Sequence, residues 1–250
     1  MNEGVLKDWT RGSFSAGDLA RDTYRRGTGP GVIVVHEVPG ITPNVVRFAN
    51  EVVAEGFTVV MPDLLGTPGR APSASYMASS LATVCISREF TTWALCETSP
   101  IIAWLRALGR QLHADVGGPG IGAVGMCFSG GFALAMMVDE TMVAPVLSQP
   151  SLPFSISKSR AADLNLSPAD LEAVARRARA GCEVLGLRYD RDRAVGTRFD
   201  ALRELLGERF IAVELPSRRM TDHSVLTEHR DEPSVRRVLG FFRDKLQRAA

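Results

Sequence analysis

Cys127 is the residue whose position in the sequence points most directly to chemistry, because it stands between two apolar runs in segment 125–130 (Gly-Met-Cys-Phe-Ser-Gly). Residues 120–126 are β-prone, and residues 128–138 have the length and composition of a buried helix. The thiol therefore lies at a strand-to-helix corner, where a nucleophile needs small neighbours two places away. The positive end of the following helix would favour the reactive thiolate. The alternative is a buried structural cysteine.

A catalytic thiol needs a base to take its proton and an acid to orient that base. In strand–helix–strand chains these groups follow the order nucleophile, acid, histidine. This chain has that order: a turn with Asp190 and Asp192 comes after Cys127, and a later polar loop holds His223. His223 is the best candidate base, and either aspartate could orient its imidazole. Both kinds of residue are also common in ordinary turns, which is the alternative interpretation.

The loop that follows the first buried strand is where this architecture takes its second oxyanion donor. We therefore predict an oxyanion hole formed by the backbone N–H groups of Val38 and Phe128. Glu37 would raise the thiol pKa by repulsion, or hold the thiol as S–H by accepting its hydrogen bond. A solvent-facing carboxylate is the alternative. His36 is a second candidate base, but its place at a strand end favours a structural hydrogen bond.

Strand-like and helix-like segments alternate along the chain, which predicts an α/β fold with a parallel sheet. Strands are expected at 32–35, 57–61, 120–126, 142–147, 183–187 and 210–215, and helices at 44–54, 128–138, 168–180 and 234–247. Helix 168–180 is marked at its start by Ser167 as N-cap and Pro168 at the first helical position.

Two irregular stretches, 62–74 and 149–167, follow strand ends. Ligands of open parallel sheets bind outside the carboxyl ends of the strands, so these loops are candidates to shape a pocket. No internal repeat or linker is evident. We expect one domain over residues 1–250, with an N-terminal lead-in segment of about 30 residues.

The composition excludes several classes of protein. The net charge of +1 in 250 residues gives no field that would attract nucleic acid or an anionic membrane. No apolar run approaches the roughly 18 residues that span a bilayer, and no signal peptide is visible, so we expect a cytoplasmic protein. The four cysteines show no zinc-binding spacing, and no nucleotide-binding glycine motif follows the first strand. We expect no metal and no cofactor.

The chain resembles the dienelactone hydrolase family, a branch of the α/β-hydrolase fold with a cysteine nucleophile. Four segments carry the resemblance: 34–40 (Val-Val-His-Glu-Val-Pro-Gly), 60–64 (Val-Met-Pro-Asp-Leu), 125–131 (Gly-Met-Cys-Phe-Ser-Gly-Gly) and 222–224 (Asp-His-Ser). It extends from about Gly31 to the C-terminal helix. The resemblance implies a mostly parallel central sheet with helices on both faces.

The resemblance also implies a Cys127–His223–Asp192 triad, with Asp190 in reserve as the acid, and Glu37 as the carboxylate that contacts the resting thiol. It implies hydrolysis of small esters or lactones through a thioester acyl-enzyme. The two backbone amides proposed above match the family's oxyanion donors.

The chain departs from the family at two positions. Ser129 stands two places after the cysteine, where the family usually has glycine. Thr227 stands four places after the histidine, where the dienelactone enzymes have an arginine that binds the substrate carboxylate, which favours a substrate other than dienelactone. Arg88 is a candidate for a replacement carboxylate contact. Three apolar residues of the second irregular stretch, Leu152, Phe154 and Ile156, either line a pocket or anchor their loop.

We therefore expect a small-molecule ester or lactone substrate, no nucleic-acid or membrane partner, and a monomer or homodimer. Two alternatives belong to other functional classes. One is a catalytically silent relative that binds a small ligand in the same cleft. The other is a redox-active thiol protein, since an accessible cysteine of low pKa is readily oxidised, although no resolving cysteine is near in the sequence.

Overall fold

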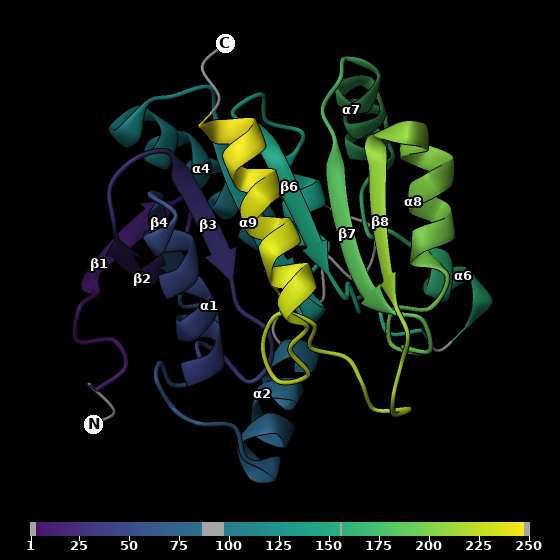
Figure 1. The fold of residues 1–250 in the computed structure, drawn as a ribbon, viewed down its shortest axis with the longest axis horizontal. Helices are drawn as coiled ribbons and strands as arrows, with labels where there is room; N and C mark the ends of the chain where they lie inside the picture. The colour runs from purple at the N-terminus through teal and green to yellow at the C-terminus, as the bar shows by residue number, and fades with distance from the viewer. Residues whose placement is uncertain (1–3, 87–97, 156, 248–250) are drawn as a thin grey trace.

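An eight-stranded sheet forms the centre of the molecule (Figure 1). The computed structural model describes residues 4–86, 98–155 and 157–247. The strands are β1 (Thr10–Ala16), β2 (Leu19–Arg26), β3 (Gly31–Val35), β4 (Thr58–Pro62), β5 (Ile121–Met126), β6 (Met142–Ser148), β7 (Val184–Tyr189) and β8 (Phe210–Leu215). Their order in the sheet is β1-β2-β4-β3-β5-β6-β7-β8. Strands β3 to β8 pair in parallel, which confirms the predicted parallel sheet.

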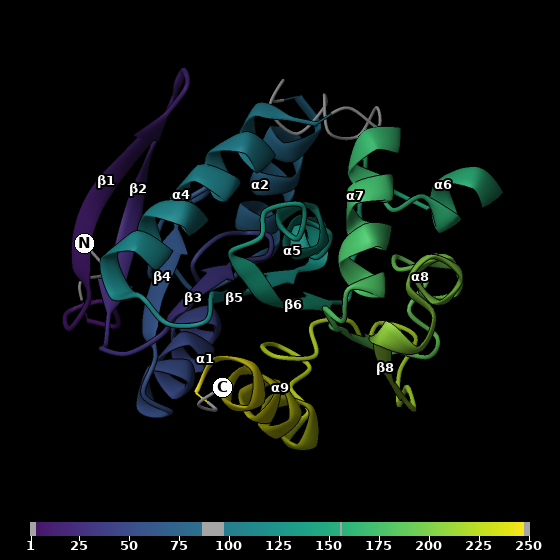
Figure 2. The same ribbon diagram turned by 90° about the horizontal axis from the view of Figure 1, so that it is seen from above.

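Helices cover both faces of this sheet (Figure 2). They are α1 (Pro43–Ala54), α2 (Ala74–Ile86), α4 (Pro100–Val116), α5 (Phe132–Met136), α6 (Lys158–Ala162), α7 (Pro168–Arg179), α8 (Arg198–Leu206) and α9 (Glu232–Leu246). One apolar core layer packs beneath α1 and α9, and a second beneath α4, α5, α7 and α8. This two-faced arrangement is the α/β-hydrolase fold that the sequence predicts.

Local sequence explains where several of these elements begin. The β-branched strands β3 and β4 are buried along their whole length, as strands covered on both faces must be. Helix α7 starts at the predicted cap, because the Ser167 side chain accepts a hydrogen bond from Asp170 N at 3.1 Å and Pro168 follows it. Among the described helices, none is long and apolar enough to cross a membrane.

The N-terminal lead-in residues form β1 and β2, which the sequence pattern did not predict. Both strands run antiparallel, and β2 extends the sheet beside β4. Their side chains are mostly polar and half-exposed, so they show no strong apolar alternation. They are held by tertiary contacts such as the edge-on packing of Phe14 against Trp104, whose ring centroids are 5.5 Å apart.

The helix predicted at 128–138 is wrong in its length. A 3₁₀ turn covers Cys127–Ser129, and α5 has only the five residues Phe132–Met136. Between them stand Gly130 and Gly131, which favour helix poorly, and Gly130 packs so closely on Pro150 that a Cβ would lie 2.5 Å from the proline Cα. The expected contribution of a long helix dipole to thiolate stability is reduced accordingly.

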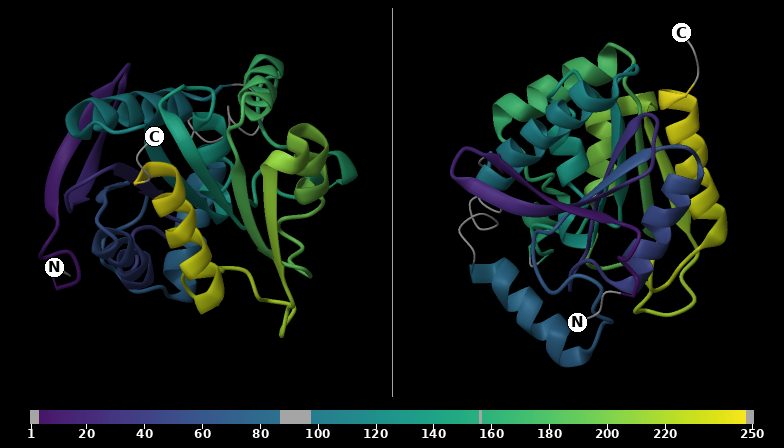
Figure 3. Two further views of the ribbon diagram at one scale, coloured as in Figure 1. Left: turned by 45° about the horizontal axis from the view of Figure 1, so that its top comes forward. Right: turned by 90° about the vertical axis from the view of Figure 1, so that its left-hand side faces the viewer.

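The carboxyl ends of the parallel strands meet at one edge of the sheet, shown at the bottom of Figure 1. Helix α2 projects beyond this edge (Figure 3). It is tied to the loops there, because Ser80 Oγ donates a 3.0 Å hydrogen bond to Pro39 O, and the Tyr76 hydroxyl is bonded to the backbone of Thr67. The chemistry-bearing loops of the sequence all leave the sheet at this edge.

Candidate active site

Cys127 occupies a sharp corner between β5 and the 3₁₀ turn. Its φ is 54°, in the left-handed region that non-glycine residues rarely adopt. The corner depends on Gly125, where an added Cβ would lie 2.0 Å from the carbonyl oxygen of Ser129. The strand, the strained residue and the close approach together have the geometry of a nucleophile elbow, which the sequence predicts at this position.

Ser129 ties this corner to the neighbouring strand β3. Its hydroxyl accepts from Met126 N at 2.9 Å and faces the carbonyl oxygens of Val35 and His36 at 3.1 and 2.9 Å. Because Val35 of β3 is also paired with Gly125 of β5, these two strands end side by side. The serine therefore adds a polar tie between the two loops that carry the candidate oxyanion donors.

The structure brings the three candidate triad residues together. Asp192 Oδ2 lies 2.6 Å from His223 Nδ1, and the side chains of the pair are 5% and 22% exposed. The Cys127 thiol interacts with the same ring. Burial lowers the pKa of His223, but the interactions with Cys127 and Asp192 outweigh it and raise that pKa to about 11. These two interactions therefore favour the protonated form of the imidazole.

The geometry separates the two candidate acids. Asp192 is buried, and its second oxygen accepts a 3.0 Å hydrogen bond from Ala194 N, which fixes the carboxylate. Asp190 instead accepts from Ser217 N at 2.9 Å and is solvent-exposed, and that hydrogen bond lowers its pKa. Of the two, Asp192 is the one in contact with the histidine.

The loop that carries His223 is held by a second histidine, which sequence reasoning missed. His229 Nδ1 accepts from the backbone N–H groups of His223 and Ser224 at 3.2 and 3.3 Å, and His229 N donates to Ser224 O at 3.0 Å. The Tyr189 hydroxyl donates to His229 O. The sequence carried no signal of this role, because the ring accepts from backbone N–H groups.

Glu37 lies within the site but is not bonded to the thiol. Its carboxylate accepts from Ser224 Oγ at 2.8 Å, from Gln149 Nε2 at 3.2 Å and from the Thr227 hydroxyl. Among the described residues, its hydrogen bonds all go to these three side chains, and none goes to Cys127. Burial raises the pKa of Glu37. The hydrogen bonds from Thr227 and Ser224 and the charge of His223 lower it, but they offset the effect of burial only in part. The carboxylate thus joins the loops after β3, β6 and β8.

Ser151 approaches the reacting groups from the loop after β6, and it too was missed. Its backbone N–H donates to Cys127 O at 3.0 Å, and its hydroxyl donates to Gln149 O at 2.7 Å. The same hydroxyl lies 3.5 Å from His223 Nε2. The residue is 4% exposed, so its position is fixed by packing and by these contacts.

Arg198, at the start of α8, is a buried cation that links two loops of the site. It donates to Pro153 O and Asp163 O of the loop after β6, and to Ala194 O and Val195 O of the loop that carries Asp192. Burial lowers the pKa of its guanidinium to about 10. An isolated arginine in the sequence gave no signal of this role, because its acceptors are backbone carbonyls.

The structure describes three of the five residues that the sequence analysis considered for the substrate side of the site. Leu152 is buried, whereas Phe154 is exposed. Thr227 is buried and donates to Glu37 rather than facing an open cleft. Arg88 and Ile156 lie outside the described residues. Of the two candidate oxyanion residues, Phe128 directly follows Cys127 in the 3₁₀ turn, and Val38 lies in the loop after β3.

His36 is a structural residue, as its strand-end position predicts. It is fully buried, Nδ1 lies 2.9 Å from Glu37 O, and Nε2 accepts from Leu64 N at 3.1 Å. The hydrogen bonds therefore require a neutral ring with its proton on Nδ1. Burial lowers the pKa of His36 to about 4.

The neutral His36 ring leads to a prediction for acid stability. In the unfolded chain His36 has the ordinary histidine pKa near 6.5, so it binds a proton at a higher pH there than in the folded protein. The free energy of unfolding therefore decreases as the pH falls from about 6.5 to about 4. We expect the wild type to lose about 3 kcal/mol more over this window than His36→Gln, whose amide oxygen can still accept from Leu64 N. Urea unfolding at a series of pH values measures this difference, and parallel pH curves for the two proteins would contradict it.

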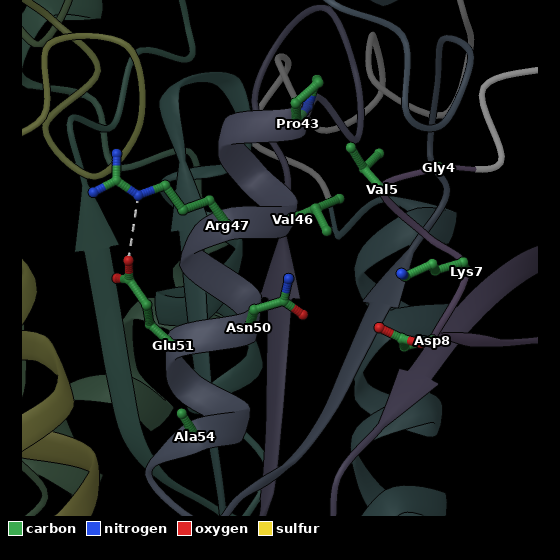
Figure 4. A pocket seen from close by; sticks show the side chains of 10 residues that line it. All are labelled: Gly4, Val5, Lys7, Asp8, Pro43, Val46, Arg47, Asn50, Glu51 and Ala54. Carbon is green, nitrogen blue, oxygen red and sulfur yellow. Dashed lines mark ion pairs between the residues drawn. The ribbon is translucent and has the colours of Figure 1, made fainter.

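A hollow elsewhere on the surface lies between the N-terminal segment and α1 (Figure 4). Its lining includes Val5, Lys7 and Arg47, and Arg47 Nε lies 3.4 Å from Glu51 Oε1. None of the residues that line it belongs to the candidate triad. Within the part of the chain that the structure describes, no group of three or more histidine, cysteine, aspartate or glutamate residues is arranged to hold a metal ion.

Comparison with known proteins gives a consistent result. The model of the dienelactone hydrolase family matches residues 19–164, which is more than half of the chain. A search of curated protein sequences finds no significant match. Solved structures with the same fold include a dienelactone hydrolase from Anabaena variabilis, with 18% identity, a TM-score of 0.62, and coverage of 95% of this chain and 98% of that chain.

Two further solved structures illustrate the range of similar proteins. A dienelactone hydrolase-like promiscuous phosphotriesterase from metagenomic libraries has 17% identity and a TM-score of 0.63, covering 95% of this chain and 98% of that one. An α/β serine hydrolase without a lid from Xanthomonas campestris has 13% identity and a TM-score of 0.59, covering 97% of both chains. At such identities the likeness establishes the fold alone.

Proposed function

Because the chain belongs to the dienelactone hydrolase family and is therefore a hydrolase, we propose that it cleaves small esters or lactones with a Cys127–His223–Asp192 triad. The observation that carries this proposal is the 2.6 Å contact between Asp192 and His223 Nδ1, on a ring that also contacts the elbow thiol. A nucleophile, a base and an orienting acid in one chain of contacts is the arrangement that nucleophilic acyl transfer requires.

In the proposed reaction, His223 Nε2 holds the proton of Cys127, and the thiolate attacks the carbonyl carbon of the substrate. The carbonyl electron pair moves to oxygen, where the backbone N–H groups of Val38 and Phe128 stabilise it. The proton on Nε2 passes to the leaving oxygen as the C–O bond breaks. A thioester on Cys127 remains, and a lactone substrate would keep its alcohol end attached to the acyl group.

Deacylation uses the same groups in the reverse order. Neutral His223 takes a proton from water, and the resulting hydroxide attacks the thioester carbonyl. The C–S bond then breaks to release the acid and restore the thiolate beside protonated His223. Asp192 keeps the ring in the tautomer with its proton on Nδ1 and stabilises the charged form, because its buried carboxylate faces that nitrogen. Loss of such an acid leaves the nucleophile in place without a correctly oriented base.

The substrate class follows from what surrounds Glu37. In this chain Thr227 occupies the position of the family's arginine, and its hydroxyl is bonded to the Glu37 carboxylate. A threonine hydroxyl offers no positive charge to a substrate carboxylate. We therefore propose esters or lactones without a carboxylate at this position. Cytoplasmic location and a monomeric or dimeric state stay predictions.

The proposal is tested by trapping the acyl-enzyme. Wild-type protein mixed with 4-nitrophenyl acetate and quenched in acid within the first turnovers should carry an acetyl group on the Cys127 peptide, detected by mass spectrometry. Its formation and decay should be at least as fast as steady-state hydrolysis, because it lies on the pathway. Acetylation that decays more slowly than turnover, or turnover without an acetylated Cys127, would overturn the thioester mechanism.

A further inference from the structure

The hydroxyl of Ser151 has a geometry that the triad alone does not use. It stands 3.5 Å from His223 Nε2, the nitrogen that exchanges the reacting proton, while Nδ1 on the opposite side of the ring faces Asp192. The Ser151 backbone is fixed to the elbow itself by its N–H donating to Cys127 O at 3.0 Å. Ser151 and the thiol thus both interact with the His223 ring.

The direction of the Ser151 hydroxyl is set by its other partner. Its hydrogen is donated to Gln149 O at 2.7 Å, so the oxygen lone pairs are left to accept from Nε2–H. Gln149 is itself held by Val225 N, which donates to its Oε1 at 3.3 Å, and by its donation to Glu37. Catalytic hydrogen bonds are often long without substrate and tighten in the reacting complex. A separation of 3.5 Å is therefore consistent with a contact that shortens when the ring is charged.

We propose that Ser151 is a further catalytic residue, whose hydroxyl accepts a hydrogen bond from His223 Nε2–H and holds the imidazolium while the sulfur of Cys127 is bonded to the substrate. This inference rests on the proposed ester-hydrolase function.

The need for such an acceptor arises from the charge changes in the reaction. When the thiolate forms the C–S bond, its negative charge moves to the carbonyl oxygen, and the sulfur no longer attracts Nε2–H. The proton stays on Nε2 until the C–O bond to the leaving group breaks and that oxygen takes it. In this interval the Ser151 hydroxyl, 3.5 Å from Nε2, can accept its hydrogen bond, and hydrogen bonds to charged groups are stronger than those between neutral groups.

Other groups around the ring also shift the pKa of His223, so a test of Ser151 must keep them unchanged. Asp192 faces Nδ1, and Cys127 makes the interaction that raises the His223 pKa most. The Glu37 carboxylate interacts with His223 through space. Removing the thiol therefore isolates the contribution of Ser151. It also brings the titration of His223 to lower pH, because the interaction with Cys127 raises the His223 pKa.

The experiment compares Cys127→Ala with Cys127→Ala/Ser151→Ala by NMR of ¹⁵N-labelled histidine side chains. The chain has four histidines, and the His223 signal is identified by its loss in a His223→Gln variant. We expect the His223 ring to lose its proton at a pH about one unit lower without Ser151, as the charged form has lost an acceptor. Ser159→Ala, a change at an exposed serine of α6, provides the matched control and should leave the midpoint unchanged.

A second measurement follows ester hydrolysis by Ser151→Ala in the presence of Cys127. We expect kcat to fall about tenfold with little change in KM, because the effect belongs to the intermediate. Coincident NMR midpoints, or a lower midpoint with unchanged kcat, would overturn the role of Ser151. If the wild type hydrolyses no ester, the proposed function fails, yet the NMR comparison still decides whether Ser151 stabilises the imidazolium.

Discussion

Replacing Cys127 by alanine is expected to lower kcat for hydrolysis of a short chromogenic ester by about 10⁴-fold or more. The reason is that the nucleophile is lost while the base and acid remain, and such groups act as a unit. The side chain is partly exposed at the elbow, so folding should be retained. The measurement is the steady-state rate of each protein, taken after their unfolding curves are shown to agree.

Cys182→Ala is the matched control for this prediction. Cys182 is also a free, half-buried thiol, but its sulfur lies 3.8 and 3.9 Å from the carbonyl oxygens of Met142 and Val143, at the amino end of β6. That end is opposite to the edge of the sheet where the candidate triad lies, so the control should keep full activity. Wild-type turnover in Cys127→Ala would exclude this residue as nucleophile.

The same pair of variants separates the two alternative functions. A redox-active thiol protein would consume peroxide stoichiometrically at Cys127 without turning over ester. A ligand-binding relative would show neither reaction, and its ligand affinity would survive Cys127→Ala.

Replacing Asp192 by asparagine is expected to lower kcat by about 10²- to 10⁴-fold. An asparagine that presents its amide N–H₂ to His223 Nδ1 would favour the wrong tautomer, and it would remove the charge that stabilises the imidazolium. The buried carboxylate contacts Nδ1 at 2.6 Å, so little water is present to replace it. The pH dependence of kcat/KM should change as well, because the pKa of His223 depends on this interaction.

Asp190→Asn is the control, and it decides between the two acids that the sequence left open. Asp190 is exposed and bonded to Ser217 N, so its replacement should change kcat by less than about twofold. An equal or larger loss of activity in Asp190→Asn than in Asp192→Asn would reverse the assignment of the acid.

Much of the fold could be predicted because it depends on local pattern. Strands such as β3 and β8 are short apolar runs, and α7 and α9 begin at polar caps followed by proline. The strands β1 and β2 could not be predicted in this way, since their polar residues owe their structure to the neighbouring strand and to α4. The length of α5 was likewise set by the close approach of Gly130 to Pro150.

The candidate site shows the same division. Cys127, His223 and the turn that holds Asp190 and Asp192 could be named from the sequence, because each follows a predicted strand and the carboxyl ends of parallel strands meet at one edge. Their order along the chain completed the pattern. The family resemblance implied that Glu37 contacts the resting thiol, but its carboxylate accepts hydrogen bonds from Ser224, Thr227 and Gln149.

The sequence by itself indicated which residues could carry out chemistry, because residue type fixes nucleophilicity and acid–base character, and apolar periodicity indicated the order of most strands and helices. Only the tertiary structure decided which aspartate faces the histidine, which hydroxyl stands at Nε2, and which loops Arg198 and Glu37 join. These depend on hydrogen bonds between residues far apart in the chain, often to backbone atoms that every sequence carries. Such contacts leave no spacing in the sequence to be read.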